Sequence, residues 1–409
     1  MKKLYLILLL MAASGFIFAQ SQPYVVLISF DGFRWDYSER GITPNIERLK
    51  ECGVHAKTLK PCFPSKTFPN HYSIITGMYP ENHGIISNNM RDLRTRKEFH
   101  LYAREEVKNP DWYKGEAFWE TTTKKGIISA SYFWPGSEVT DASRRPTYSF
   151  KYKHNFPYEN RIDTVINWLT LPEDLRPHFI ATYFHDTDSY GHQYGPNSPE
   201  IDSSIVRLDN IIGYFYRELE RINMQDSVNV ILVSDHGMTE IYADKIISVG
   251  EITSGYHYES IDNGPFLLIE PEENEIDSLF SELKSHEEHF TTYTKSTIPD
   301  YYHFSHNDLI FSLILVADPG WTLVDKTESE EWYLDGKGTH GYDNNFLDMH
   351  GTFIVNGPHF KNGYKTGTLN NIDIYPLLCE IFNLKIDHKI DGELNNIKFI
   401  LNNNQKKYE

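Results

Sequence analysis

The sequence predicts an α/β fold in which a mostly parallel central sheet carries helices on both faces. Apolar runs without polar alternation recur along the 409-residue chain, and such strands are buried on both sides, as in parallel sheets. Segments with apolar residues at helical spacing lie between the runs. Polar residues gather where the runs end, which is where open α/β sheets place their ligand sites.

Four apolar runs supply the expected strands. They are "YVVLISF" (24–30), the first part of "PHFIATYFHDTDSYGH" (177–192), "NVILVSDHG" (229–237) and "MHGTFIVNG" (349–357). Each is short and rich in β-branched or aromatic residues, which favours a strand over a buried helix. We therefore expect all four in the central sheet.

Helices are predicted at 43–53, 159–170 and 198–222. The last begins with Ser198-Pro199-Glu200, which is typical of a helix start. Residues 255–335 mix short strand-like pieces with acidic and aromatic residues, and they predict an α+β excursion within the main domain. That domain is expected to span 20–400, followed by a frayed tail at 401–409.

Residues 1–19 have the pattern of a secretory signal peptide. Lys2 and Lys3 precede an apolar stretch from Leu4 to Phe18, which is short for a membrane span, and Ala19 offers a cleavage point. An uncleaved anchor is the alternative. Cleavage predicts a periplasmic or secreted protein that keeps no stable membrane span.

The charge of the chain limits its partners. A formal net charge of −18 argues against binding a polyanion along an extended surface, so we expect no nucleic-acid polymer as partner. A small anionic substrate gathered by local metal ions remains compatible with this charge. Among the three cysteines, Cys52 and Cys62 could pair in an oxidising compartment, which leaves Cys379 as a free thiol.

Carboxylate and imidazole groups cluster beside the predicted strands, and mixed Asp and His ligands suit zinc and neighbouring metals. Six groups would make two three-ligand sites, and paired metals can hold the attacking and leaving oxygens of a phosphoryl transfer. The alternative for any one of these histidines is a structural role. The six candidates are Asp31, Asp188, His192, Asp235, His236 and His350.

Thr67 opens a helix-like stretch, "KTFPNHYSIITG", and has two possible roles. It could be a plain N-cap, whose hydroxyl accepts a hydrogen bond from the helix. It could also be a nucleophile, because metal coordination lowers the pKa of a hydroxyl and a helix N-terminus favours an anion. The neighbouring metal candidates favour the nucleophile.

At these residues the chain resembles the nucleotide pyrophosphatase/phosphodiesterases of the alkaline phosphatase superfamily. The resemblance runs in family order from about residue 25 to 358 and implies an alkaline phosphatase-like fold for the main domain. The matching segments are "SFDGFRWDY", "KTFPNHYSIITGMYPENHGIISNNM", "WYKGEAFW", "FWPGSEV", "DTDSYGHQYGP", "SDHGM", "HGYDN" and "MHGTFIVNGP".

The resemblance implies two zinc ions per chain, a covalent phospho-threonine at Thr67 that water hydrolyses, and nucleoside 5′-monophosphates as products. It also implies that the amide of Asn88 stabilises the charged phosphoryl oxygens, although Asn88 could be only a turn residue. One zinc ion would be held by Asp31, Thr67, Asp235 and His236, and the other by Asp188, His192 and His350.

The resemblance further implies a substrate pocket for a nucleotide or another small phosphodiester. Phe68 and Tyr152 are expected to stack on a base, while for Leu101 and Tyr183 core packing is an equal alternative. Glu105 or Glu106 stands where nucleotide-preferring relatives can carry a lysine, which argues against a preference for triphosphates. The expected substrate contacts are Phe68, Asn88, Leu101, Trp134, Tyr152 and Tyr183.

Three alternatives remain beside this interpretation. "CFPSK" at 62–66 imitates a sulfatase motif, but nine residues before Thr76-Gly77 the chain has Thr67, which cannot become formylglycine as Cys62 could. A choline-phospholipid or head-group phosphodiesterase would share the catalytic set. A non-catalytic binding protein on the same fold is disfavoured because the nucleophile and ligand positions are intact.

Overall fold

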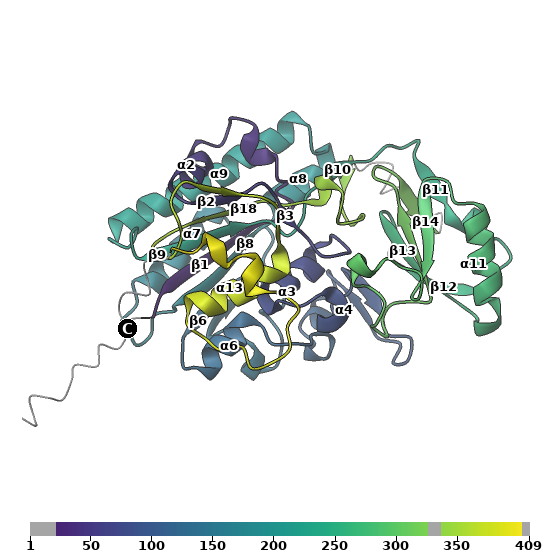
Figure 1. The fold of residues 1–409 in the computed structure, drawn as a ribbon, viewed down its shortest axis with the longest axis horizontal. Helices are drawn as coiled ribbons and strands as arrows, with labels where there is room; N and C mark the ends of the chain where they lie inside the picture. Colours follow the sequence, from purple (N-terminus) through teal and green to yellow (C-terminus); the bar gives the residue numbers. More distant parts are fainter. Residues whose placement is uncertain (1–21, 326–336, 403–409) are drawn as a thin grey trace, which may run out of the picture.

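The computed structural model describes residues 22–325 and 337–402 (Figure 1). The predicted signal peptide at 1–19 and most of the predicted tail at 401–409 lie outside the described residues. Within them, a large α/β body carries a smaller α+β lobe at one end (Figure 1).

The body is built on an eight-stranded sheet with the order β19–β2–β18–β9–β1–β8–β6–β7. The strand at its centre, β1, pairs in parallel with both β8 and β9. The strands are β1 (Tyr24–Phe30), β2 (Val54–Ala56), β6 (Ser129–Tyr132), β7 (Tyr148–Phe150), β8 (Phe179–Phe184), β9 (Val228–Val233), β18 (Phe353–Asn356) and β19 (Tyr364–Thr366).

The sheet is mostly parallel, as the sequence predicted, with β18 as its antiparallel member. The apolar run at 349–357 therefore forms a strand, but it runs against its neighbour β9. The sequence could not show this direction, because a strand buried on both faces has the same apolar pattern whichever way it runs.

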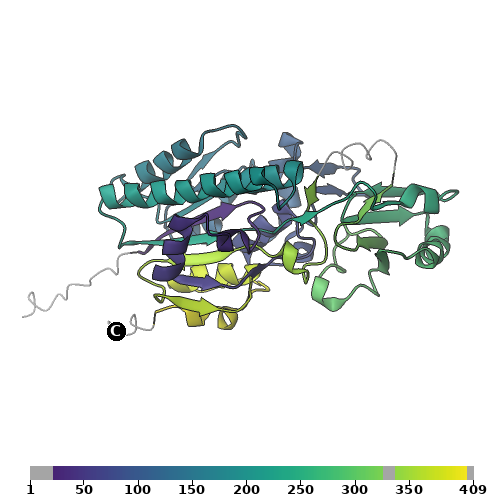
Figure 2. The ribbon, with the colours of Figure 1, turned by 90° about the horizontal axis from the view of Figure 1, so that it is seen from above.

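Helices cover both faces of the sheet because side chains alternate across each strand. Val26 and Ile28 of β1 pack into one core with helices α2 (Pro44–Cys52), α7 (Tyr158–Leu169) and α9 (Pro199–Arg221). Val25 and Leu27 pack into the opposite core with α3 (Thr67–Thr76), α6 (Phe118–Lys124) and α13 (Ile374–Ile381). Figure 2 shows α9 along one face of the sheet and the C-terminal segments on the other.

The three predicted helices are present with nearly the expected bounds. Residues 43–53 contain α2, 159–170 correspond to α7, and 198–222 contain α9. Ser198 is the N-cap of α9, and its hydroxyl accepts a hydrogen bond of 3.2 Å from the backbone N–H of Ile201.

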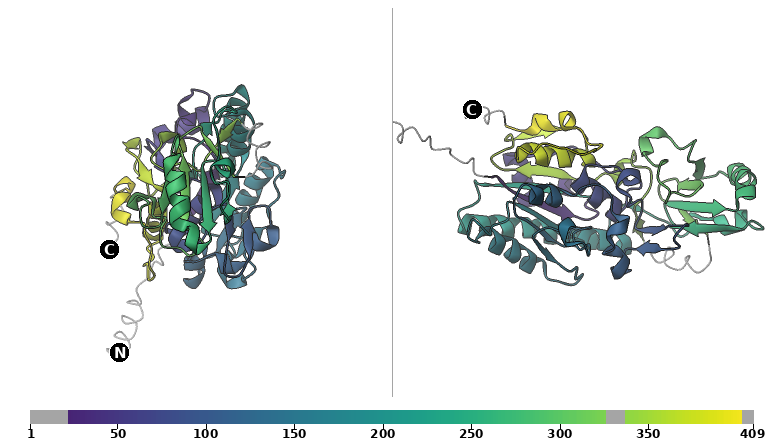
Figure 3. Two further views of the ribbon diagram at one scale, coloured as in Figure 1. Left: turned by 90° about the vertical axis from the view of Figure 1, so that its right-hand side faces the viewer. Right: turned by 90° about the horizontal axis from the view of Figure 1, so that it is seen from below.

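Most of the smaller lobe lies within the predicted excursion at 255–335, although β11 (Ile246–Ser248) and α10 (Val249–Ile252) belong to it and precede that range (Figure 3). Its antiparallel sheet has the order β12–β13–β15–β14. Helix α11 (Ile276–Ser285) packs on it and contributes Leu279 and Leu283 to a separate core. The strands are β12 (Tyr258–Ile261), β13 (Phe266–Pro271), β14 (Phe290–Thr294) and β15 (Leu313–Ala317). Residues 326–336 lie outside the described part.

Cys52, Cys62 and Cys379 are free thiols in this structure, so the possible Cys52–Cys62 disulfide is not formed. Within residues 22–325 and 337–402, no helix is both long and apolar enough to cross a membrane.

Candidate active site

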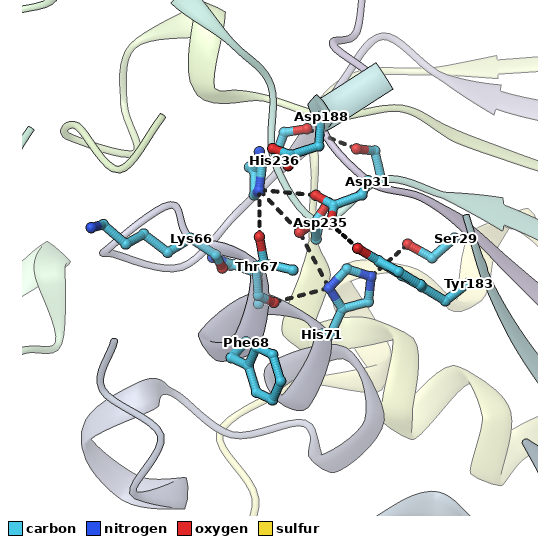
Figure 4. A network of polar contacts seen from close by, with 12 residues as sticks. Ser29, Asp31, Lys66, Thr67, Phe68, His71, Tyr183, Asp188, Asp235 and His236 are labelled. Carbon is cyan, nitrogen blue, oxygen red and sulfur yellow. Dashed lines mark hydrogen bonds and ion pairs between the residues drawn. The ribbon is translucent and has the colours of Figure 1, made fainter. Parts of the chain in front are cut away.

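Three adjacent parallel strands bring the carboxylates of the site to one edge of the sheet. Asp31 follows β1, and Asp235 with His236 follows β9. Asp188 and His192 lie in α8 (Asp186–Tyr194), which begins directly after β8. Because β8 and β9 flank β1 in parallel, their carboxyl ends meet, and Figure 4 shows Asp31, Asp188 and Asp235 converging on His236.

Thr67 reaches this edge as the first residue of α3. The N-cap is Lys66, whose backbone is extended at φ −120° and ψ 158°. The hydroxyl oxygen of Thr67 lies 3.3 Å from Nε2 of His236 (Figure 4). Thr67 is therefore not the plain N-cap, and its hydroxyl faces the carboxylate cluster instead.

Two overlapping groups of side chains have the spacing of metal sites. Asp31, Asp235 and His236 form one, with Nε2 of His236 at 3.2 Å from Asp31 Oδ1 and 3.1 Å from Asp235 Oδ2. Asp188, His236 and His340 form the other. Nε2 of His340 is 3.4 Å and Nε2 of His192 is 3.3 Å from Asp188 Oδ1.

The buried polar atoms of this cluster fit metal ions. Oδ1 of Asp31, Oδ1 of Asp188 and Oδ2 of Asp235 are buried and have no hydrogen-bond partner. A buried carboxylate oxygen without a hydrogen bond is costly, and cations at these oxygens would compensate it. The mixture of carboxylate oxygens and imidazole nitrogens is the donor set that zinc accepts.

The pKa values of Asp31 and His236 reflect the same crowding of negative charge. Burial, followed by the charges of Asp235 and Asp188, raises the pKa of Asp31 from 3.8 to about 7. Although burial opposes a charged imidazole, the carboxylates of Asp235 and Asp31 raise the pKa of His236 to about 10. A positive charge is thus favoured at the centre of the cluster.

The predicted ligand His350 does not join this cluster, and His340 takes its place. Nδ1 of His350 lies 2.8 Å from the hydroxyl of Thr58, and Nε2 lies 3.0 Å from the backbone oxygen of Asn344. Both ring nitrogens are therefore engaged elsewhere. The position next to Asp188 is corrected to His340, whose ring stacks on that of His236 at 3.5 Å.

His340 was missed because no apolar run precedes it. It follows the two-residue strand β17 (Gly338–Thr339), which pairs with β10 (Thr239–Glu240) just beyond His236. Its segment "HGYDN" was among those that carried the family resemblance, and this was the available signal.

His71 is a further residue that the sequence analysis missed. It lies one helical turn after Thr67, with Nδ1 2.9 Å from the backbone oxygen of Thr67 and 3.2 Å from Asp235 Oδ2. Nε2 lies 2.8 Å from the hydroxyl of Ser29 (Figure 4). The ring therefore ties the first turn of α3 to β1 and to the carboxylate cluster.

The side-chain amide of Asn88 is oriented by the backbone of α3, the helix that begins with Thr67. Its oxygen accepts a hydrogen bond of 2.9 Å from the N–H of Phe68. Because the oxygen is engaged, the NH₂ group remains as the donor available to a ligand beside Thr67.

A pocket of about 690 Å³ opens over this cluster. All six predicted substrate contacts line it: Phe68, Asn88, Leu101, Trp134, Tyr152 and Tyr183. Trp134 is nearly fully buried, and its indole N–H donates to the backbone oxygen of His71 at 3.0 Å. The hydroxyl of Tyr183 donates to Asp31, so this tyrosine also orients a metal-ligand candidate.

Two other sequence features lie apart from the pocket lining. Cys62 is buried and its thiol donates to Oδ1 of Asn371, so it does not occupy the position that Thr67 holds. Glu105 pairs with Lys108, and Glu106 accepts from the indole of Trp112. Neither glutamate is among the residues that line the pocket.

Comparisons with known proteins agree with this arrangement. The type I phosphodiesterase/nucleotide pyrophosphatase family matches residues 25–343. The human ectonucleotide pyrophosphatase/phosphodiesterase family member 1 is 39% identical over 373 residues, which are 88% of this chain and 40% of that protein. A bis(5′-adenosyl)-triphosphatase of Xenopus laevis is 36% identical over 94% of this chain and 82% of its own length.

A solved structure is also closely similar. The murine family member 5, as an inactive threonine-to-alanine variant in complex with AMP, superposes with a TM-score of 0.87. It is 33% identical, and the alignment covers 93% of this chain and 100% of that one. The chain therefore belongs to the type I phosphodiesterase/nucleotide pyrophosphatase family of hydrolases.

Proposed function

We propose that this protein is a two-zinc nucleotide phosphodiesterase/pyrophosphatase that acts through a covalent phospho-threonine. The observation that carries the proposal is the hydroxyl of Thr67, which sits at a helix N-terminus facing three carboxylates, each with one buried oxygen that has no hydrogen-bond partner. One zinc ion would be held by Asp31, Thr67, Asp235 and His236, and the other by Asp188, His192 and His340.

Each part of the chain has a defined task in this reaction. When bound, the metal ions lower the pKa of the Thr67 hydroxyl and neutralise phosphate charge. The Thr67 oxygen attacks phosphorus, the leaving group departs, and water then hydrolyses the ester to release a nucleoside 5′-monophosphate. The NH₂ group of Asn88 donates to a phosphoryl oxygen, and the N-terminus of α3 favours the same anion.

We propose that the base of the nucleotide stacks between Phe68 and Tyr152. Both line the pocket, and the ring of Phe68 is fixed edge-on against Phe99 at 5.5 Å. Tyr152 is held by the backbone, since its N–H donates to Glu138 at 3.0 Å. The AMP complex of the murine relative and the adenosyl substrate named for the Xenopus relative support a nucleotide.

Tyr152→Ala tests the base site separately from the chemistry. It should lower kcat/KM for p-nitrophenyl-TMP by a factor that corresponds to roughly 1 to 3 kcal/mol, the contribution of one stacked base. The kcat/KM for bis-p-nitrophenyl phosphate, which has no base, should be nearly unchanged. Equal losses on both substrates would mean that Tyr152 only supports the fold.

A panel of p-nitrophenyl esters tests the reaction class: the TMP ester, phosphate, phosphorylcholine and sulfate. We expect the TMP ester to exceed p-nitrophenyl phosphate in kcat/KM by a factor of about 10 or more, because Asn88 is a neutral donor suited to a monoanionic diester. Faster cleavage of the phosphorylcholine ester would favour a head-group phosphodiesterase. No turnover of any ester by zinc-loaded protein would favour a binding protein.

We also propose that the protein is exported through the signal peptide at 1–19 and acts outside the cytoplasm. The lysines and apolar stretch of that segment support this, as does the "ecto" designation of the human relative. N-terminal sequencing of the mature protein, with cleavage expected after Ala19, tests it.

A further inference from the structure

The lobe contributes Asp262, Asn263 and Pro265 to the pocket lining, and Asp262 forms a buried ion pair with Lys66, the residue before Thr67. Asp262 directly follows β12, and its carboxylate lies 2.6 Å from Nζ of Lys66. The two side chains are only 4% and 9% exposed. Ser87 donates a hydrogen bond to the second carboxylate oxygen of Asp262. Asp262 therefore has both oxygens engaged, and Lys66 has its charge compensated by the protein.

The position of Lys66 is fixed by further contacts. Its Nζ lies 4.9 Å from the ring centroid of Phe266, and its aliphatic chain packs against Gly341, where a Cβ would approach Lys66 Cε to 2.9 Å. Figure 4 shows Lys66 and Phe68 leaving the first turn of α3 in different directions. The ammonium of Lys66, with Asp262 bound to it, therefore points away from the ring of Phe68.

The other cation that lines the pocket is neutralised in the same way. Arg104 donates to both carboxylate oxygens of Glu138, at 2.7 and 2.6 Å, beside Tyr152. Among the described residues, Lys66 is the one lysine and Arg104 the one arginine that line the pocket. Within this part of the chain, neither offers an uncompensated charge to the phosphates of a leaving group.

We propose that Asp262 is a specificity-determining residue that withholds Lys66 from the leaving group. This rests on the proposed function, in which the base stacks between Phe68 and Tyr152, and it adds that the leaving group lies on the side of Thr67 to which Lys66 points. An anionic pyrophosphate leaving group meets a closed, neutral ion pair that offers it no net positive charge. An alcohol, phenol or nucleoside leaving group carries no such negative charge. The enzyme thus prefers phosphodiesters to nucleoside triphosphates.

The test compares kcat/KM for ATP with kcat/KM for p-nitrophenyl-TMP in the same preparation. Asp262→Asn leaves the ammonium of Lys66 buried and uncompensated, so an incoming pyrophosphate group would satisfy it. We expect the ATP to p-nitrophenyl-TMP ratio to rise at least tenfold. A ratio within twofold of wild type would overturn the proposal.

A double variant covers the possibility that Asp262→Asn folds poorly. Lys66→Met with Asp262→Asn removes both charges and leaves no unpaired ion, so the ratio should stay within threefold of wild type. If Lys66 instead grips phosphate in the wild type, this variant would lower the ratio tenfold or more, and the proposal would be wrong. Glu138→Gln, which frees Arg104 at the base end, is the matched control and should not raise the ratio.

A binding measurement supplies a readout that does not depend on turnover. Inorganic pyrophosphate should raise the Tm of zinc-loaded Asp262→Asn more than that of wild type, and an equal shift in both would count against the proposal. Absence of p-nitrophenyl-TMP turnover by the wild type would instead overturn the proposed function. Failure of the reaction class and failure of the specificity assignment are therefore distinguishable.

Discussion

At the scale of single residues, Thr67 differs from an ordinary helix-capping threonine in what its hydroxyl faces. The capping position belongs to Lys66, and the hydroxyl of Thr67 points to His236 rather than to a backbone N–H of α3. Nδ1 of His71 lies 2.9 Å from the backbone oxygen of Thr67. The first turn of α3 therefore presents the Thr67 hydroxyl to the carboxylate cluster, and His71 connects this turn to Asp235 and Ser29.

Thr67→Ala should abolish nearly all turnover of p-nitrophenyl-TMP while leaving the fold and most of the bound metal in place. The proposed covalent step has no substitute for the hydroxyl, whereas the carboxylates remain. Thr67→Ser, which keeps an oxygen at this position, should retain part of the activity. If Thr67→Ala kept a tenth of the wild-type rate, direct attack by water would be the better mechanism.

Variants of His340 and His350 test which of the two histidines binds metal. His340→Ala should reduce bound zinc from about two ions per chain to about one, since it removes a ligand next to Asp188. His350→Ala should keep both ions and lose only hydrogen bonds to Thr58 and Asn344, at a cost in stability of about 1 to 3 kcal/mol. Metal analysis of the purified variants decides between them, and the reverse pattern would restore His350 as the ligand.

At the scale of elements, α3 depends on a buried histidine beneath its first turns. Nδ1 of His83 accepts from the N–H of Ile85 at 3.2 Å, while Nε2 lies 2.9 Å from the hydroxyl of Ser73 and 3.2 Å from the backbone oxygen of Pro69. This pattern requires a neutral ring. Burial lowers the pKa of His83 from 6.5 to about 3.

This burial gives a prediction for stability against pH. Because the folded pKa lies below the unfolded value, the unfolded state binds the proton first, and the contribution is complete above pH 6.5 and lost as pH falls toward 3. At pH 4 the loss should be about 3 kcal/mol in the free energy of unfolding. Urea unfolding of metal-free protein at pH 7 and pH 4 measures it, with His83→Asn as the reference that should lose less. Equal pH dependence in both proteins would mean that His83 does not contribute.

At the scale of the whole molecule, the site joins segments from across the described chain. The carboxylates follow β1, β8 and β9, α3 supplies Thr67, the proposed nucleophile, and His340 follows β17 of the strand pair β10–β17. The lobe adds Asp262 to the lining of the pocket. Metal ions at the buried carboxylates would therefore hold together elements that are distant in sequence.

Removal of metal should consequently lower global stability as well as activity. EDTA should abolish turnover and lower the Tm on the order of 10 °C, because each bound ion at a thousandfold excess over its Kd contributes about 4 kcal/mol to the folded state. Zinc should restore both. An unchanged Tm in a preparation shown to be metal-free would mean that the carboxylates are compensated without metal.

By itself, the sequence determined the α/β class, the three helices, and Asp31, Asp188, Asp235 and Thr67 at the strand and helix ends, because apolar runs and the residues after them are local signals. Only the tertiary structure decided that β18 runs antiparallel, since an apolar run carries no direction. Only the tertiary structure decided that His340 lies beside Asp188 while both nitrogens of His350 are engaged. It also paired Lys66 with Asp262, 196 residues apart, because an ion pair between two lobes depends on how they pack and leaves no pattern in either segment.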